Sequence, residues 1–143
     1  MTDFLAGAEL LAPELVPYVR GAAEGRPVLP RCASCGRFQF PPRPVCRYCP
    51  SEEFEWPEIT LRGTIYSWTV TERAPLPALA DRVPLTLVVV ALDLPDPVRL
   101  VGRLEPSPDD PALAAGAAVV GDFRSDPAAE APVLYWRLAR ADS

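Results

Sequence analysis

The sequence predicts a mainly β protein in which a helical arm and a small cysteine-rich ribbon precede a β-barrel. Three observations carry this prediction: apolar residues at helical spacing near the N-terminus, four cysteines in two close pairs, and a period of two from residue 59 onwards. A chain of 143 residues with 49% apolar content can bury one modest core, or one core and a small second module that needs a cross-link or a metal ion to hold it together. We therefore expect an arm at residues 1–25, a ribbon at 26–58 and a barrel at 59–143.

Apolar residues in the arm recur at roughly helical spacing, which predicts short helical pieces. They are Phe4, Leu5, Leu10, Leu11, Leu15, Val16 and Val19. Pro13 and Pro17 limit any single long helix, and Gly21 and Gly25 are expected to end the segment. This apolar stripe could pack on the chain's own barrel or dock on a partner, and base rates favour packing on the barrel.

The ribbon contains two Cys-x-x-Cys turns, Cys32 to Cys35 and Cys46 to Cys49, with ten residues between them. Each turn can place two sulfurs on one ion, so the two turns together make a closed tetrahedral site of the kind that holds structural zinc. In a reducing cytoplasm four thiolate ligands are expected in preference to two disulfides. We predict that Cys32, Cys35, Cys46 and Cys49 bind one structural Zn²⁺.

The same cage could instead hold iron, because the Cys-x-x-Cys-Gly turn that starts at Cys32 looks like half of a rubredoxin site. The second turn ends in Pro50 and not in glycine, which favours zinc. A closed four-cysteine zinc site has no open coordination position and cannot activate water. Its expected work is to hold together a module too small to fold alone.

Five segments of the remaining chain predict strands. They are residues 64–71, 85–92, 98–104, 119–124 and 133–138. In the first, Tyr66, Trp68 and Val70 alternate with hydroxyl side chains and are expected to form the buried face. The second is a continuous apolar run suited to a strand that is covered on both sides.

The chain between the third and fourth strands predicts one short helix. Asp109 and Asp110 offer an N-cap, Pro111 suits the first turn and Gly116 ends the helix. Five short strands with a lone helix in this place are the element order of an oligonucleotide/oligosaccharide-binding (OB) barrel. The proline-rich stretches 74–84 and 106–111 are expected loops, and the first is a candidate binding loop.

The composition excludes much of ordinary enzymology. The chain has no histidine and no lysine, which removes histidine-dependent triads, Schiff-base chemistry and a P-loop lysine. No pair of carboxylates, nucleophile or phosphate loop stands out, so we predict no catalytic residue and no enzyme activity of the chain by itself. The N-terminal Met1-Thr2-Asp3 is unlike a signal peptide, and the longest apolar run is too short to cross a bilayer. A soluble cytoplasmic protein is expected.

Net charge is −5, but its distribution is uneven: residues 26–50 carry five arginines and no acidic residue. The predicted barrel has eight arginines against eleven acidic residues, which argues against nucleic acid as its ligand. Four aromatic residues could stack bases, although aromatics in strands more often lie in the core. They are Tyr66, Trp68, Tyr135 and Trp136. A single-strand nucleic-acid binder and a rubredoxin-like electron carrier remain alternatives.

Three stretches together resemble a known family. They are Arg31-Cys-Ala-Ser-Cys-Gly-Arg-Phe-Gln-Phe-Pro-Pro-Arg43, Cys46-Arg-Tyr-Cys49 and Gly63-Thr-Ile-Tyr-Ser-Trp68. The family is that of the acyl-CoA-associated zinc-ribbon/OB-fold proteins, DUF35. The resemblance implies that the four cysteines are zinc ligands. It also implies an accessory subunit of a thiolase-superfamily enzyme, or a segment fused to a MaoC-type hydratase.

In such a complex, the resemblance implies, the partner performs ketothiolase condensation or retro-aldol cleavage of an acyl-CoA. The accessory protein assembles the complex and helps to shape the path of CoA. The Ala, Arg and Pro bias of the sequence favours sterol side-chain or fatty-acyl degradation as the pathway, and a biosynthetic acyltransferase remains the alternative. Local positive charge, independently of the resemblance, makes Arg37 and Arg43 candidate contacts for the CoA phosphates.

Overall fold

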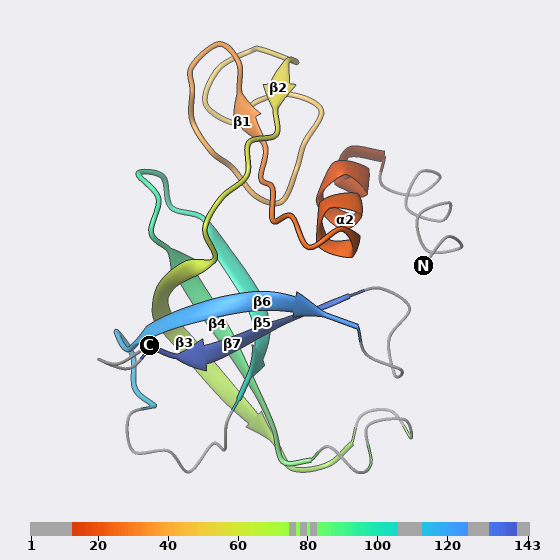
Figure 1. Cartoon of the computed structure of the whole chain (residues 1–143). Coiled ribbons are helices and arrows are strands. Elements are labelled where there is room, and N and C mark those ends of the chain that lie inside the picture. Colours follow the sequence, from red (N-terminus) through yellow and green to blue (C-terminus); the bar gives the residue numbers. More distant parts are fainter. Residues whose placement is uncertain are drawn as a thin grey trace.

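The computed structural model describes residues 13–74, 77, 80, 83–105, 113–125 and 132–139 of the chain. A short helix comes first, followed by a two-stranded ribbon and a closed five-stranded barrel, as the sequence predicts (Figure 1). The helix lies beside the ribbon on the same side of the barrel (Figure 1). Residues 1–12 of the predicted arm lie outside the described residues.

The helical part consists of a single turn of 3₁₀ helix, η1 (Pro13–Leu15), and the helix α2 (Val16–Ala23). Pro17 lies in the first turn of α2, where its missing N–H leaves no hydrogen bond unmade. Gly21 does not end the helix: it is buried inside it, where a Cβ atom would lie 2.4 Å from the carbonyl oxygen of Arg26. The chain turns back at Gly25, which has a φ of 72°.

The helix α2 packs on its own chain through Tyr18. The ring of Tyr18 lies 5.0 Å from that of Phe40 in the ribbon and 5.9 Å from that of Phe123 in the barrel, between centroids. Val16, Val19 and Ala22 are buried on the same helix. This part of the arm therefore joins the ribbon to the barrel.

The ribbon pairs β1 (Arg31–Cys32) with β2 (Phe54–Glu55) in antiparallel fashion. The barrel strands are β3 (Arg62–Thr71), β4 (Leu85–Leu92), β5 (Arg99–Leu104), β6 (Ala118–Arg124) and β7 (Val133–Leu138). They close in the order β3-β4-β5-β7-β6, with β5 and β7 parallel and the other pairs antiparallel. This order confirms the predicted OB barrel.

The predicted helix between β5 and β6 falls largely on residues 106–112, outside the described part of the chain. Residues 113–117, which are described, contain a turn at Gly116 with a φ of 87° and no helix. The proline-rich stretches 74–84 and 106–111 also lie mostly outside the described residues.

Trp136 lies at the centre of the barrel core with 1% of its surface exposed. Two glycines flank its indole: a Cβ atom on Gly102 or on Gly121 would lie 2.7 Å from ring atoms of Trp136. Ile65 of β3 and valine and leucine side chains of the other four strands belong to the same buried cluster as the indole. The core thus depends on two positions without a side chain on neighbouring strands.

The predicted buried face of the first strand is wrong. Tyr66, Trp68 and Val70 are 56%, 38% and 41% exposed. A β-bulge shifts the register between Ile65 and Ser67, so the alternation changes phase at Tyr66. Trp68 and Val70 pair with the buried residues of β4. In this part of β3 the strand no longer pairs with β6, and the hairpin of β3 and β4 projects past the barrel (Figure 1). Both side chains therefore remain exposed.

Candidate metal centre and the ribbon–barrel junction

The four cysteines converge at the tip of the ribbon. Their sulfur atoms all lie within 4.8 Å of one another, with Cys32 and Cys49 3.5 Å apart and Cys35 and Cys46 3.8 Å apart. A zinc ion with Zn–S bonds of about 2.3 Å needs sulfurs about 3.8 Å apart. The donor set and its spacing therefore fit one tetrahedral metal ion, and no other metal-binding group of this kind occurs within the described ranges.

Backbone N–H groups of the two turns point at sulfur. The N–H of Cys35 donates to Cys32 Sγ at 3.4 Å, and this bond lowers the pKa of the Cys32 thiol to about 6. At Cys46 burial raises the pKa, but hydrogen bonds from the N–H of Tyr48 and from Gln39 bring it below its ordinary value. These hydrogen bonds favour the thiolate, the form that binds a metal, at Cys32 and Cys46. At Cys35 and Cys49 burial and the neighbouring thiols raise the pKa.

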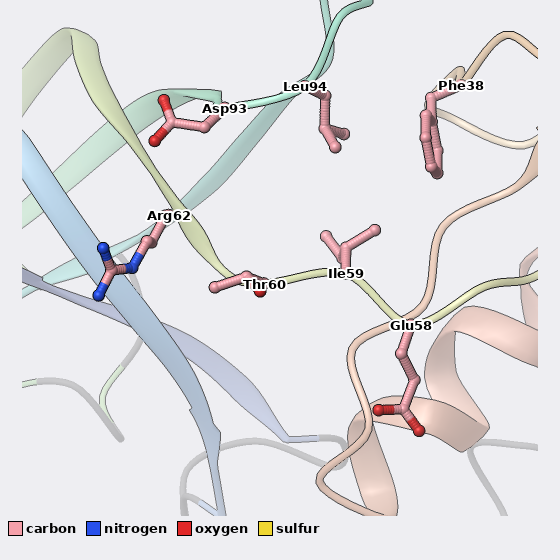
Figure 2. Close-up of a pocket in the computed structure, with 7 residues that line it drawn as sticks. All are labelled: Phe38, Glu58, Ile59, Thr60, Arg62, Asp93 and Leu94. Carbon is pink, nitrogen blue, oxygen red and sulfur yellow. The ribbon is translucent and has the colours of Figure 1, made fainter.

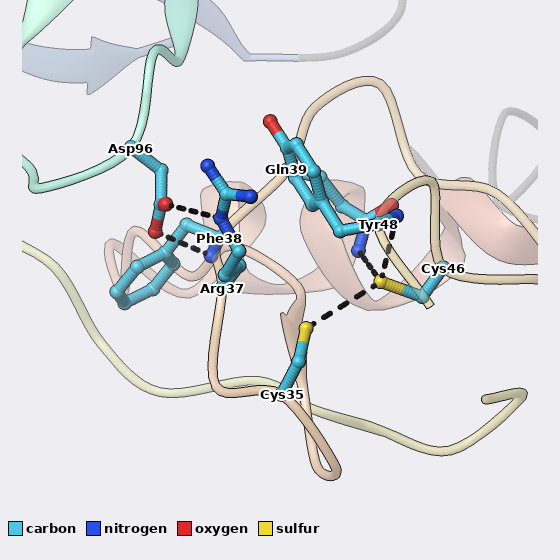
Figure 3. A network of polar contacts seen from close by, with 7 residues as sticks. All are labelled: Cys35, Arg37, Phe38, Gln39, Cys46, Tyr48 and Asp96. Carbon is cyan, nitrogen blue, oxygen red and sulfur yellow. Dashed lines mark hydrogen bonds and ion pairs between the residues drawn. The ribbon is translucent and has the colours of Figure 1, made fainter. Parts of the chain in front are cut away.

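Gln39 is the polar side chain most closely tied to the site. It is only 2% exposed, and its Nε2 donates to Cys46 Sγ at 3.4 Å (Figure 3). Its Oε1 accepts from the N–H of Arg47 at 3.1 Å. It fixes the second Cys-x-x-Cys turn from outside the metal cage. The sequence analysis missed this role, for which the one available signal was an uncharged polar residue between two phenylalanines.

Asp96 connects the ribbon to the barrel. It follows β4 in the connection to β5, and its carboxylate accepts from Arg37 Nε at 3.1 Å and from the N–H of Phe38 at 2.9 Å (Figure 3). The Arg37 guanidinium also lies over the ring of Tyr48, 3.7 Å from its centroid. The contact of Asp96 with residues 58 and 59 positions away was not visible in the sequence.

The two arginines proposed as CoA contacts occupy different surroundings. Arg37 belongs to the junction just described, with its side chain about half exposed. Arg43 makes no ion pair with any residue in the described part of the chain, and it lines a cavity of about 200 Å³ between the ribbon and the start of the helical segment. Glu14 and Glu52 line the same cavity and reduce its positive potential.

A larger groove of about 650 Å³ follows the linker between β2 and β3 (Figure 2). At one end Phe38 of the ribbon faces Ile59 and Leu94, with Glu58 next to Ile59, and the other end carries Arg62 and Asp93 (Figure 2). It is an open groove with no set of side chains suited to proton transfer or nucleophilic attack. Among the described residues no helix combines the length and apolar character needed to cross a bilayer.

Comparisons with known proteins agree with this architecture. Residues 20–55 match the family model of the "ChsH2, rubredoxin-like zinc ribbon domain", and residues 56–124 match that of the "ChsH2, C-terminal OB-fold domain". A solved structure titled "Ltp2-ChsH2(DUF35) aldolase" superposes with a TM-score of 0.76 at 29% identity, covering 89% of this chain and 95% of that one. A DUF35-family protein of unknown function from Sulfolobus solfataricus shares the fold, with a TM-score of 0.59 at 18% identity, covering 90% and 87%.

Two curated relatives are longer proteins. A probable enoyl-CoA hydratase alpha subunit of Thermomonospora curvata is 33% identical over 129 residues, which are 88% of this chain and 38% of that protein. The benzoylsuccinyl-CoA thiolase subunit BbsA of Thauera aromatica is 28% identical over 117 residues, which are 82% of this chain and 64% of BbsA. The chain thus spans less than two thirds of either relative.

Proposed function

Since the chain belongs to the ChsH2 (DUF35) family of zinc-ribbon and OB-fold proteins, we propose that it is a non-catalytic accessory subunit of a thiolase-superfamily enzyme that acts on acyl-CoA. The observation that carries the proposal is the similarity over 95% of a chain whose structure is titled an Ltp2-ChsH2(DUF35) aldolase. The name of BbsA, a thiolase subunit, points in the same direction.

The residues of the chain support an accessory role. Histidine and lysine are absent, and the four cysteines are gathered at one metal site. The site holds the ribbon together, and carbon–carbon chemistry on the acyl-CoA, condensation or cleavage, falls to the partner. The three units of the chain, 1–25, 26–58 and 59–143, then serve as arm, metal-stapled ribbon and barrel of one small subunit.

A MaoC-type hydratase is the second partner that we propose. The support is the relative named an enoyl-CoA hydratase alpha subunit, of which this chain matches only 38%. Degradation of sterol side chains or fatty acyl chains remains the pathway we propose.

Arg37 and Arg43 are the residues that we propose as contacts for the CoA phosphates. We place Arg43 ahead of Arg37 as a phosphate contact, because the Arg37 guanidinium is already engaged by Asp96 and Tyr48. Substituting Arg43→Ala in the assembled complex is expected to weaken CoA binding about tenfold, since a charge-assisted contact to phosphate is lost. Equal CoA affinity of the wild-type and variant complexes, measured by calorimetry, would remove Arg43 from the site.

Co-expression with thiolase-fold proteins of the source organism tests the central claim. We expect one of them to co-elute with the chain in a fixed ratio and to turn over its acyl-CoA only, or much faster, in the complex. The purified chain alone should show no turnover. Activity of the chain by itself, or failure to co-elute with any thiolase-fold protein at low salt, would refute the proposal.

A further inference from the structure

One side of the barrel is apolar and incompletely covered. In β4 the buried side chains of Thr86, Val88, Val90 and Leu92 alternate with outward side chains that are only half-buried. The outward side chains are Leu85, Leu87, Val89 and Ala91. Such a continuous apolar run is typical of a strand covered on both faces, but in the described chain β4 is fully covered on one face alone.

The neighbouring strands extend this apolar surface. Val101 of β5 pairs with Val89 and is 60% exposed, the largest exposure of any large apolar side chain in the described ranges. Tyr66 lies at the bulge of β3, opposite the same part of β4, and is 56% exposed. Contiguous exposed apolar groups of this kind mark interaction surfaces.

Val101 also forms one wall of a groove of about 260 Å³ next to α2. The opposite wall is made by Tyr18, Val19 and Ala22 of α2, and Phe123 and Leu134 lie at the barrel side. Every residue that lines the groove is uncharged. An apolar side chain of a partner would fit there as the buried anchor that typically dominates an interface.

The charge of this face is opposite to that of the chain. The outward charged side chains of β3, β4 and β5 are Arg62, Arg99 and Arg103, with no acidic residue in these strands, whereas the net charge of the chain is −5. The Arg99 guanidinium lies over the ring of Tyr66, 4.0 Å from its centroid. Two copies of the chain meeting at this face about a two-fold axis would bring arginines together, which is unfavourable.

We propose that the outer face of β3, β4 and β5, together with the groove between Val101 and α2, is the surface that docks on the thiolase-fold subunit. The partner's surface is then apolar at its centre and carries Asp or Glu at its rim. This inference rests on the proposed function and adds the place of contact to it. Its occupant is a folded protein surface and not nucleic acid, because aliphatic side chains occupy β4, where a stacking platform would need aromatics.

Substitution at Val101 tests the proposal in the complex of the full chain with its thiolase-fold subunit. Val101→Glu puts a charge at the centre of the apolar face, and we expect it to weaken the complex about a hundredfold or more. Val70→Glu is the matched control, since Val70 is also an exposed valine, lies in the same sheet and pairs with Thr86 on the opposite face. It should bind as the wild type does.

Arg99→Glu is the second variant, and it should weaken the complex and reduce the dependence of its affinity on salt. Zinc content and thermal unfolding establish that each variant is folded. If folded Val101→Glu and Arg99→Glu bind as tightly as wild type, or if Val70→Glu loses as much affinity as Val101→Glu, the assigned face is wrong. Self-association through Val101, or tight binding of an oligonucleotide at this face, would also overturn it. If the wild-type chain binds no thiolase-fold subunit, the proposed function falls and this inference falls with it.

Discussion

At the scale of single residues, Gln39 stabilises the metal site, because it hydrogen-bonds both a metal-ligand sulfur and the backbone of the second Cys-x-x-Cys turn. Substituting Gln39→Ala removes both bonds and leaves Arg47 N–H without its partner. We expect zinc affinity to fall about tenfold, as is usual when a group that orients a ligand is removed.

Competition with a chromophoric chelator measures this affinity. Ser34→Ala is the control, because the Ser34 side chain donates to the Ser51 hydroxyl on the same ribbon, while the Ser34 backbone that bonds Cys32 is kept in the variant. If the Gln39→Ala variant binds zinc as tightly as the Ser34→Ala variant does, the hydrogen bond to Cys46 Sγ does not stabilise the site.

Tyr18 gives the protein a specific response to alkaline pH. Burial raises the pKa of Tyr18 to about 12 from its ordinary value of 10.0. The unfolded chain therefore loses this proton before the folded chain does, so the contribution of Tyr18 to stability is complete below pH 10 and is lost as pH rises towards 12. In Tyr18→Phe the free energy of unfolding should fall less steeply above pH 10 than in wild type. Parallel curves from urea denaturation at several pH values would contradict this.

At the scale of the elements, the connection between β4 and β5 holds the ribbon through Asp96. Asp96→Ala leaves the Phe38 N–H and the Arg37 guanidinium without their acceptor, so we expect the zinc-loaded protein to lose about 1–3 kcal/mol of stability. Asp93→Ala, an exposed change in the same connection, should cost much less. Denaturant unfolding of both variants measures the difference in stability. Equal midpoints for the two variants would mean that the contacts of Asp96 do not stabilise the protein.

The packing of β6 on β7 depends on the absence of a side chain at Gly121. A Cβ atom there would lie 2.7 Å from Trp136, so Gly121→Ala should destabilise the barrel by about 1–3 kcal/mol through overpacking. Adding Trp136→Phe removes part of the ring that clashes. The double variant should therefore lose less free energy of unfolding than the two single variants lose together. Strict additivity in a double-mutant cycle would contradict the clash.

At the scale of the whole molecule, the metal holds a ribbon that has only two short strands and little core of its own. Structural zinc contributes on the order of 10 kcal/mol to such modules. Cys35→Ser, or removal of zinc by a strong chelator, should therefore unfold the ribbon, release α2 from Phe40 and abolish binding to the thiolase-fold subunit. Metal analysis, circular dichroism and a binding assay with the partner proposed above test this. A Cys35→Ser chain that keeps one zinc and assembles normally would refute it.

The pattern of the sequence was sufficient for the strands and for the gathering of the cysteines. β4 and β7 occupy the predicted residues, because each segment carries the apolar residues of its own strand. The four cysteines meet because two tight turns suffice to bring their sulfurs together, and that information lies within a few residues of each cysteine.

The sequence by itself therefore determined the order of helix, ribbon and barrel and the set of metal-binding sulfurs, since both follow from local spacing. Only the tertiary structure decided that Asp96 joins the barrel to the ribbon, that a bulge puts Tyr66 on the opposite face of β3 from Trp68 and Val70, and that the outer side of β4 lies beside arginines and an apolar groove. These features depend on contacts between residues far apart in the chain and on where one strand loses its neighbour. The apolar period of a single segment contains no information about either the distant contacts or the end of a strand's pairing.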